Sequence, residues 1–340
     1  MSSGLGIISL NEIEDNLDND FFHGQKVGTT TYFEDSIDTC WKWRQGEFNL
    51  WTGYMGEGKT ELYKQLALIK ALKEGKKFAF FSPENMPANE FFMELAFPLM
   101  GRNPYKHSEW KCMSDGDFKT AKEFLNNHFF AVNPKGRKLE DIETAFKYLK
   151  EKHDIYGALI DPFLKVSHER DADASYIADF MGRCSDFSKE LDISYSLIAH
   201  QLTPEIDKKT ENYTKPDPYR IKGGGNFADG ADNVMIVWRP QKRTSKSDTT
   251  VHFESSKIKR HELVSQPNDC TLNFDFKTKW YSFNKINPIQ TFWNKGIESK
   301  KVTKEDIDIA YNKIEGNGVI DFELAYQHPD PEATVKDAPF

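Results

Sequence analysis

Short apolar runs alternate with amphipathic segments over the first 200 residues of the chain. Runs typical of buried strands lie at residues 46–53, 76–84, 128–133, 156–161 and 194–200. Between them, apolar residues recur at helical spacing over residues 59–74, 87–100, 115–126, 139–152 and 175–191. Strands and helices that alternate in this order predict an α/β domain, with a mostly parallel sheet and helices on both faces.

The pattern changes after residue 200. Residues 202–231 are polar, hold several prolines and a run of three glycines, and predict a long loop or lid. Strand patterns return at residues 231–239, 249–257 and 270–276, and a helix is predicted over residues 303–315 before a polar tail.

A short amphipathic helix is predicted ahead of the main domain. Ser9 and Glu12 have the spacing of a capping box, and the apolar residues at helical intervals are Leu10, Ile13, Leu17 and Phe21. The chain is therefore expected to divide into an N-terminal helix in residues 1–24, a main domain in residues 25–284, and a C-terminal helical extension with an acidic tail in residues 285–340.

The net charge of −8 is unevenly distributed. The first 40 residues carry eight acids and one lysine, and the last 40 carry nine acids and four lysines, which leaves about +4 for residues 41–300. A nucleic-acid partner is therefore not excluded. No segment approaches the roughly 18 apolar residues of a membrane span, the N-terminus lacks a basic signal region, and the four cysteines are scattered. We expect a cytoplasmic protein with no membrane partner.

Residues 53–60 match the motif GxxxxGK[ST] between a predicted strand and a predicted helix. The glycines let backbone N–H groups point into one concavity that binds phosphates. The motif predicts an ATP site with Mg²⁺, in which Lys59 neutralises the β- and γ-phosphates and the Thr60 hydroxyl binds the metal. The predicted nucleotide-binding residues are Gly53, Gly56, Glu57, Gly58, Lys59, Thr60 and Glu61. Glu57 is expected to face outward, because the backbone makes the phosphate contacts.

Polar residues end three of the predicted strands. Asp161 follows an apolar strand and either binds the Mg²⁺ shell or caps the next turn. Glu84 either polarises the water that attacks the γ-phosphate or supplies charge to a helix N-terminus. Gln201 and His200 close a further strand, and either sense the γ-phosphate or have structural roles.

Two basic segments lie far from the motif in sequence. Lys257, Lys259 and Arg260 either protect an exposed strand edge or reach the triphosphate of a neighbouring subunit. The cations of the polar loop either grip a nucleic-acid backbone together with the glycine run or belong to a solvated loop; they are Lys208, Lys209, Lys215, Arg220 and Lys222.

Together these segments resemble, over residues 22–284, the RecA-like motor domain of superfamily 4 replicative helicases of the DnaB and Twinkle type. The resemblance rests on the order of the segments GYMGEGKT, FFSPENMP, ALIDPF, IAHQLTPE, RIKGGGNFADGADNVMIVWR and SSKIKRHE. It implies that Glu84 is the catalytic base, that Gln201 senses the phosphate, and that Lys257 is a trans-acting lysine. The family's Lys-x-Arg pattern is altered here, so the finger is either Lys259 or Arg260.

The resemblance further implies a DNA-dependent ATPase that forms a ring, most often a hexamer, and the small size of the chain favours one of phage or mobile-element kind. Single-stranded DNA would contact Arg220, Lys222, Gly223 and Gly224, a primase or loader would be a further partner, and the N-terminal helix would dock on the next subunit or cover its own domain. The alternatives are a recombinase or recombination mediator that forms DNA filaments, and a RecA-fold binding partner without turnover.

Overall fold

The computed structural model describes residues 8–106, 111–168 and 173–299. Within these residues, nine strands form one sheet in the order β3-β2-β4-β5-β1-β6-β7-β8-β9. The strands are β1 (Glu47–Gly53), β2 (Phe78–Phe81), β3 (Phe129–Val132), β4 (Gly157–Ile160), β5 (Ser194–His200), β6 (Asn233–Trp238), β7 (Thr250–Ile258), β8 (Asp269–Asp275) and β9 (Trp280–Ser282). The pairings from β3 to β6 are parallel and those from β6 to β9 are antiparallel, which confirms the predicted α/β class.

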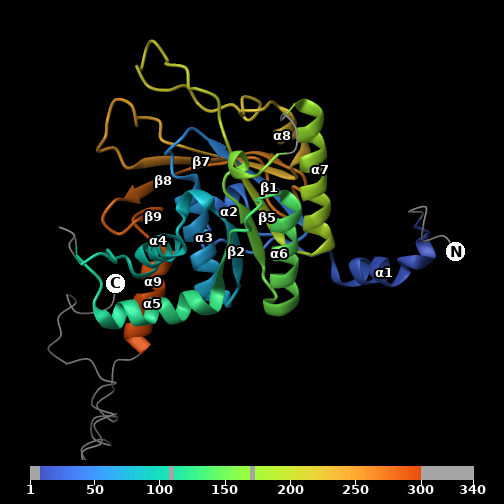
Figure 1. Ribbon diagram of the computed structural model, residues 1–340, viewed down its shortest axis with the longest axis horizontal. Helices are drawn as coiled ribbons and strands as arrows, with labels where there is room; N and C mark the ends of the chain where they lie inside the picture. Colours follow the sequence, from blue (N-terminus) through green and yellow to red (C-terminus); the bar gives the residue numbers. More distant parts are fainter. Residues whose placement is uncertain (1–7, 107–110, 169–172, 300–340) are drawn as a thin grey trace, which may run out of the picture.

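Helices cover both faces of the sheet (Figure 1). The helices of the described residues are α1 (Glu14–His23), α2 (Ile37–Cys40), α3 (Lys59–Glu74), α4 (Ala88–Met100), α5 (Asp115–His128), α6 (Leu139–His153), α7 (Ala174–Glu190), α8 (Asn226–Gly230) and α9 (Pro288–Ser299). Two hydrophobic cores result: one contains residues of α3, α4 and α5, and the other contains residues of α6, α7 and α8. Neighbouring residues of β1 point to opposite cores, since Trp51 belongs to the first and Leu50 to the second.

The pattern along each strand follows its place in the sheet. The central strand β2 is buried over all four residues, because a parallel strand is covered by helices on both sides. The antiparallel strand β8 alternates exposed and buried residues along its whole length, because only one of its faces is covered. This difference explains why β2 is a continuous apolar run in the sequence and β8 is not.

Both ends of the chain add helices to the main domain. The predicted capping box is present, with the Ser9 N–H donating to Glu12 Oε2 at 3.0 Å, but α1 has no buried residue and extends away from the body (Figure 1). Leu17 and Phe21 are therefore exposed, and the alternative in which they cover their own domain is wrong. At the other end, α9 packs on the main domain, with Trp293 Nε1 donating to Leu99 O at 2.8 Å.

The sequence prediction missed four of the helices and strands, of which the short helix α2 precedes β1. The loop predicted over residues 202–231 ends in the helix α8, and β9 and α9 follow the last predicted strand. The helix predicted over residues 303–315 lies outside the described residues. Every helix in the described part of the chain is too short or too polar to cross a bilayer.

Candidate nucleotide and nucleic-acid site

The glycine motif forms a tight turn between β1 and α3, which we call the P-loop (residues 53–60). Gly53 has φ of +144°, and a Cβ there would lie 2.1 Å from Val237 O on the neighbouring strand β6. Gly58 has φ of +95°, and a Cβ there would lie 2.2 Å from the Tyr281 hydroxyl, which donates to Gly58 O at 2.9 Å. Only glycine fits at these two points, so β6 and β9 fix the shape of the turn.

Lys59 folds back over the P-loop. Its Nζ donates to Gly53 O at 3.0 Å and to Tyr54 O at 2.8 Å, and the residue is only 3% exposed. Burial lowers the pKa of Lys59 to about 8, although Asp161 and Glu57 act in the opposite direction. An ammonium held by neutral carbonyls can transfer to an anion without leaving a buried charge unpaired, which suits a phosphate-binding lysine.

Asp161 lies beside the P-loop, as its place at the end of β4 predicts. Its Oδ2 accepts hydrogen bonds from Thr60 Oγ1 at 3.0 Å and from Ser82 Oγ at 3.2 Å. Burial raises the pKa of Asp161 to about 6. A carboxylate and a hydroxyl oxygen side by side fit the oxygen ligands that Mg²⁺ takes, with phosphates and water completing its shell. Ser82, which the sequence analysis did not single out, holds this carboxylate in place.

Glu84 is exposed in the 3₁₀ turn Pro83–Asn85, directly after β2. Its Oε1 lies 3.6 Å from Lys165 Nζ, and both side chains are open to solvent. Because Ser82 of the same segment bonds Asp161, the turn carries Glu84 to the rim of the metal-binding corner. Glu61, also exposed, lies in the first turn of α3.

Gln201 joins the P-loop strand to a protruding loop. Its Nε2 donates to Thr52 Oγ1 at 3.0 Å, and its backbone N–H donates to Gly53 O at 3.4 Å. Residues 202–221 then leave the body and return, since Gln201 pairs with Ile221 and Leu202 N donates to Arg220 O at 3.0 Å. We call residues 202–221 the arm; it extends above the sheet in Figure 1.

His200 lies next to Gln201, at the end of β5. Its pKa is lowered to about 4, first by burial and then by the charges of Lys59 and Lys222, so the imidazole is neutral at pH 7. His200 O also accepts the Lys222 N–H at 2.9 Å. The residue therefore helps to close the base of the arm.

The predicted DNA-binding residues lie at or just beyond the end of the arm. Arg220 is exposed and pairs with Glu205 of the arm at 2.7 Å, and Lys222 is exposed. Gly223 and Gly224 have φ of +117° and +118°, and the chain then enters α8. A Cβ at Gly224 would meet no atom within 4 Å, so this backbone is open to a ligand.

Lys257 near the end of β7, and Lys259 and Arg260 just after it, lie near the amino ends of the parallel strands, whereas the P-loop lies at their carboxyl ends. Arg260 NH1 is 3.1 Å from Glu47 Oε1 at the start of β1, whereas the P-loop follows the end of the same strand. Six steps along a strand span roughly 20 Å, so the cations do not reach the P-loop of their own chain.

Each of these cations has a partner in its own chain. Lys259 Nζ pairs with the buried Asp232 at 2.6 Å. Lys257 Nζ instead donates to two backbone carbonyls of α8, Ala228 O at 3.0 Å and Asp229 O at 2.9 Å. The structure thus brings together Lys59, Thr60, Asp161 and Gln201, and places Lys257, Lys259 and Arg260 elsewhere.

The predicted outward orientation of Glu57 is wrong. The residue is 1% exposed, its Oε2 accepts the Arg239 N–H at 2.5 Å, and its Oε1 lies 3.4 Å from Lys242 Nζ. Both partners follow β6, a region that the sequence analysis interpreted only as the end of a strand. The carboxylate therefore anchors a neighbouring loop of its own chain to the P-loop.

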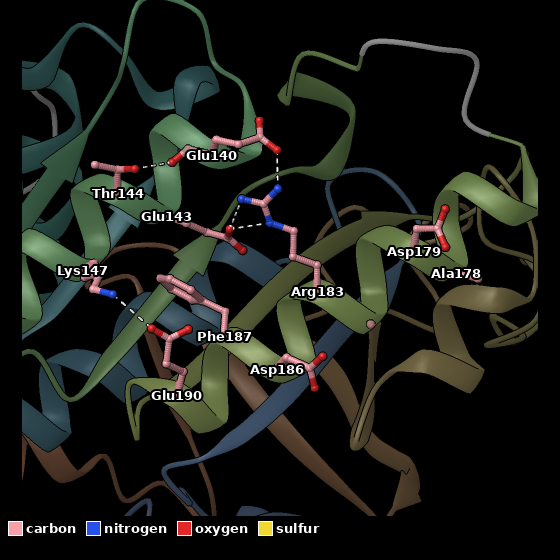
Figure 2. Close-up of a pocket in the computed structure, with 11 residues that line it drawn as sticks. Glu140, Glu143, Thr144, Lys147, Ala178, Asp179, Arg183, Asp186, Phe187 and Glu190 are labelled. Carbon is pink, nitrogen blue, oxygen red and sulfur yellow. Dashed lines mark hydrogen bonds and ion pairs between the residues drawn. The ribbon is translucent and has the colours of Figure 1, made fainter. Parts of the chain in front are cut away.

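A groove of about 850 Å³ lies between α6 and α7, away from the P-loop (Figure 2). Arg183 crosses it to Glu143 at 2.7 Å and also pairs with Glu140. Its charged lining consists of Glu140, Glu143, Asp179, Asp186 and Glu190 against Lys147 and Arg183. This acidic excess repels phosphates, so the groove does not compete with the P-loop as the nucleotide site.

The fold and the P-loop define a RecA-like nucleotide-binding domain. Residues 28–283 match the family model of the DnaB-like helicase C-terminal domain. The match covers most of the chain, so the protein belongs to the family of DnaB-like helicase C-terminal domains, which confirms the resemblance and supports a helicase that hydrolyses nucleotide.

Two solved structures share this fold. One, described as an ATPase domain, aligns with a TM-score of 0.64 at 15% identity, over 80% of this chain and 98% of its own. A DnaB-like replicative helicase, described with its interactions with primase, aligns with a TM-score of 0.62 at 14% identity, over 80% of this chain and 67% of its own. At these identities the likeness shows the fold. No curated protein matches the chain.

Proposed function

We propose that the protein is an ATP-dependent DNA helicase that forms a ring, translocates on single-stranded DNA and binds its nucleotide between subunits. The observation that carries the proposal is the junction at the ends of β1 and β5. There the P-loop, Asp161 and Gln201 meet, and Gln201 leads directly into the arm.

Each residue at this junction has a separate role in phosphoryl transfer. The P-loop N–H groups receive the phosphates, and Lys59 exchanges its two carbonyl partners for the β- and γ-phosphates. Thr60 and Asp161 hold Mg²⁺, which neutralises the phosphate charge when bound. Glu84 leaves the solvent-exposed contact with Lys165 and polarises the attacking water.

Gln201 reports the state of the nucleotide to the DNA-binding segment. In the structure its amide contacts Thr52, one residue before the P-loop, and its backbone starts the arm. A γ-phosphate that attracts the amide would shift the base of the arm, and with it Arg220 and Lys222. Those cations and the backbone at Gly223 and Gly224 bind the DNA backbone without reading its sequence.

A second subunit completes the nucleotide site. Lys257, Lys259 and Arg260 cannot reach the P-loop of their own chain, so a head-to-tail neighbour is needed to bring them to the γ-phosphate. Lys257 is the most suitable of the three, because it leaves only neutral carbonyls of α8 when it moves. Its release would also loosen α8, which follows the glycine run.

The exposed helix α1 is the contact that we assign to the ring. Its apolar residues have no partner among the described residues of their own chain's main domain, and a neighbouring main domain would cover them. A primase is a candidate partner of the assembled ring, by analogy with the replicative helicase structure described above.

Strand displacement tests the proposal. Forked DNA with either a 5′ or a 3′ single-stranded tail is incubated with the protein and ATP, and mass photometry of the same sample gives the size of the assembly. We expect closed rings that unwind one of the two forks. Open filaments that pair strands without unwinding would overturn the proposal in favour of a recombinase.

A further inference from the structure

Residues 239–249, which connect β6 to β7, contact both the P-loop and the arm; we call them the strap. Lys242 Nζ donates to Met55 O in the P-loop at 2.7 Å. The next two strap residues contact the arm: Arg243 NH1 donates to Glu211 O, and Thr244 Oγ1 donates to Asn212 Oδ1 at 2.8 Å. Three consecutive residues therefore bridge the nucleotide cradle and the predicted DNA-binding loop.

The contact of Lys242 fixes one peptide plane of the cradle. In a trans peptide the C=O of one residue and the N–H of the next point in opposite directions. Since Lys242 holds Met55 O, the Gly56 N–H points away from the strap lysine. Gly56 has φ of +69°, a left-handed conformation that favours glycine, and a Cβ there would lie 3.0 Å from Lys242 Nζ.

Glu57 explains why the lysine stays at this position. Its buried carboxylate accepts the Arg239 N–H at the start of the strap and pairs with Lys242 three residues later. A carboxylate so close to a phosphate site would repel the ligand if it were unpaired. The ammonium of Lys242 compensates this charge, and the two contacts hold the strap against the P-loop.

The strap approaches the cradle from the side opposite to the proposed hydrolytic residues. Asp161, Gln201 and Glu84 follow β4, β5 and β2, which lie on one side of β1, whereas the strap follows β6 on the other side. Lys242 is therefore placed to orient the cradle and not to take part in hydrolysis.

The arm contacts the same region directly. Tyr213 of the arm packs against Tyr54 of the P-loop, with ring centroids 6.0 Å apart. Asn212, its neighbour, also accepts the Thr244 N–H at 3.3 Å. A change in the P-loop can therefore reach the arm by two routes. One runs through the strap and Tyr213 to the outer part of the arm, and the other runs through Gln201 to its base.

We propose that Lys242 is a positioning residue that orients the Met55–Gly56 peptide for nucleotide phosphates, and that the strap couples this peptide to single-stranded DNA held by the arm. The inference rests on the proposed function, since it assigns nucleotide to the P-loop and DNA to the arm. It also gives Glu57 a role, as the anchor of the strap.

The test measures the coupling between the two ligands. The dissociation constant of a fluorescent ATP analogue is determined with and without an oligo(dT) strand, and the ratio of the two constants is the coupling factor, which is typically about 5- to 150-fold in coupled proteins. For Thr244→Val and for Arg243→Ala we expect a reduced coupling factor with nucleotide affinity unchanged in the absence of DNA, since each variant removes one side-chain contact between the strap and the arm. For Lys242→Met we expect a loss of about tenfold in nucleotide affinity and a reduced coupling factor.

Lys246→Met is the matched control, because Lys246 is an exposed strap lysine with no side-chain hydrogen bond or ion pair to the described residues. Thermal unfolding of each variant checks that the fold is kept. Wild-type coupling in both Thr244→Val and Arg243→Ala overturns the role of the strap, and equal effects of Lys242→Met and Lys246→Met overturn the role of Lys242. A wild-type protein that binds no ATP analogue or no oligo(dT) would instead contradict the proposed function.

Discussion

The cations at the two ends of the parallel strands are held in different ways; we call the carboxyl ends of these strands the carboxyl edge and their amino ends the amino edge. At the carboxyl edge, Lys59 donates only to backbone carbonyls of its own loop. At the amino edge, Lys259 and Arg260 pair with Asp232 and Glu47, whose side chains are almost completely buried. A cation on a carbonyl is available to an incoming phosphate, whereas one that neutralises a buried carboxylate leaves that charge uncompensated when it moves.

Lys257 resembles Lys59 in its hydrogen-bond partners, although it lies at the amino edge. Both lysines are partly or wholly buried, both donate to two carbonyls, and burial lowers the pKa of both. The residue type and the spacing in the sequence do not separate Lys257 from its neighbours. The hydrogen-bond and ion-pair partners distinguish them, and these partners favour a phosphate-binding role for Lys257 and a stabilising role for Lys259.

The largest effect is expected from Lys59→Ala. The variant removes the cation that the P-loop offers to the β- and γ-phosphates, and ATP hydrolysis should fall at least about 100-fold. A coupled phosphate-release assay measures it, with Lys119→Ala on the exposed face of α5 as the control. Normal hydrolysis by Lys59→Ala would refute the assignment of the nucleotide site.

Subunit mixing tests whether Lys257 acts on a neighbour. Lys257→Ala should lose about 100-fold or more in hydrolysis, because a trans cation stabilises charge in the transition state. When it is mixed with Lys59→Ala, some interfaces regain an intact P-loop from one subunit and an intact Lys257 from the next, so activity should return. Two inactive variants that stay inactive after subunit exchange would contradict a role for Lys257 in the nucleotide site of a neighbouring subunit.

Lys259→Met should act mainly on stability. Asp232 would keep the Phe48 N–H at 3.0 Å but lose its closest cation, which should cost about 1–3 kcal/mol in the free energy of unfolding. Urea denaturation measures this cost. Lys257→Met is the comparison variant and should cost less, since its carbonyl partners carry no charge; the reverse order would contradict the contrast between the two lysines.

The smallest effect is expected from pH. The pKa of Lys59 is about 8 without nucleotide, so above pH 8 the lysine must take up a proton before it can bind phosphate. Nucleotide affinity should therefore weaken by up to about tenfold per pH unit above pH 8 and stay level just below it. Titration of the ATP analogue between about pH 7 and 9.5 measures this, and the slope should be absent from the residual binding of Lys59→Ala.

The main features of the fold and the cradle follow from the sequence because they depend on local patterns. The strand predicted at residues 46–53 is observed over Glu47–Gly53, and the helix predicted at residues 59–74 is observed over Lys59–Glu74. The position of Asp161 follows from a general rule, since the carboxyl ends of parallel strands meet at one edge of the sheet. Short elements such as β9, with three residues, are too brief to show a period.

Contacts between distant segments could not be predicted in the same way. Glu57 and Arg239 are 182 positions apart, and the strap residue Lys242 lies in a polar loop with no periodic pattern. The pairing of Arg260 with Glu47 depends on the register of β6 and β7 against β1, which a single sequence does not specify. The sequence therefore pointed to these cations as candidate functional residues, but it did not show which residues they contact.

The helix α1 has a thermodynamic consequence for assembly. It is ten residues long and buries none of them, and isolated helices of this length are marginal in water. If α1 docks on a neighbouring subunit, as proposed above, its helical state depends on the surface that covers Leu17 and Phe21, and the ordering of α1 and the association of subunits become one equilibrium. Helix content measured by circular dichroism should then rise with protein concentration, so dilution would melt α1 as it separates the subunits.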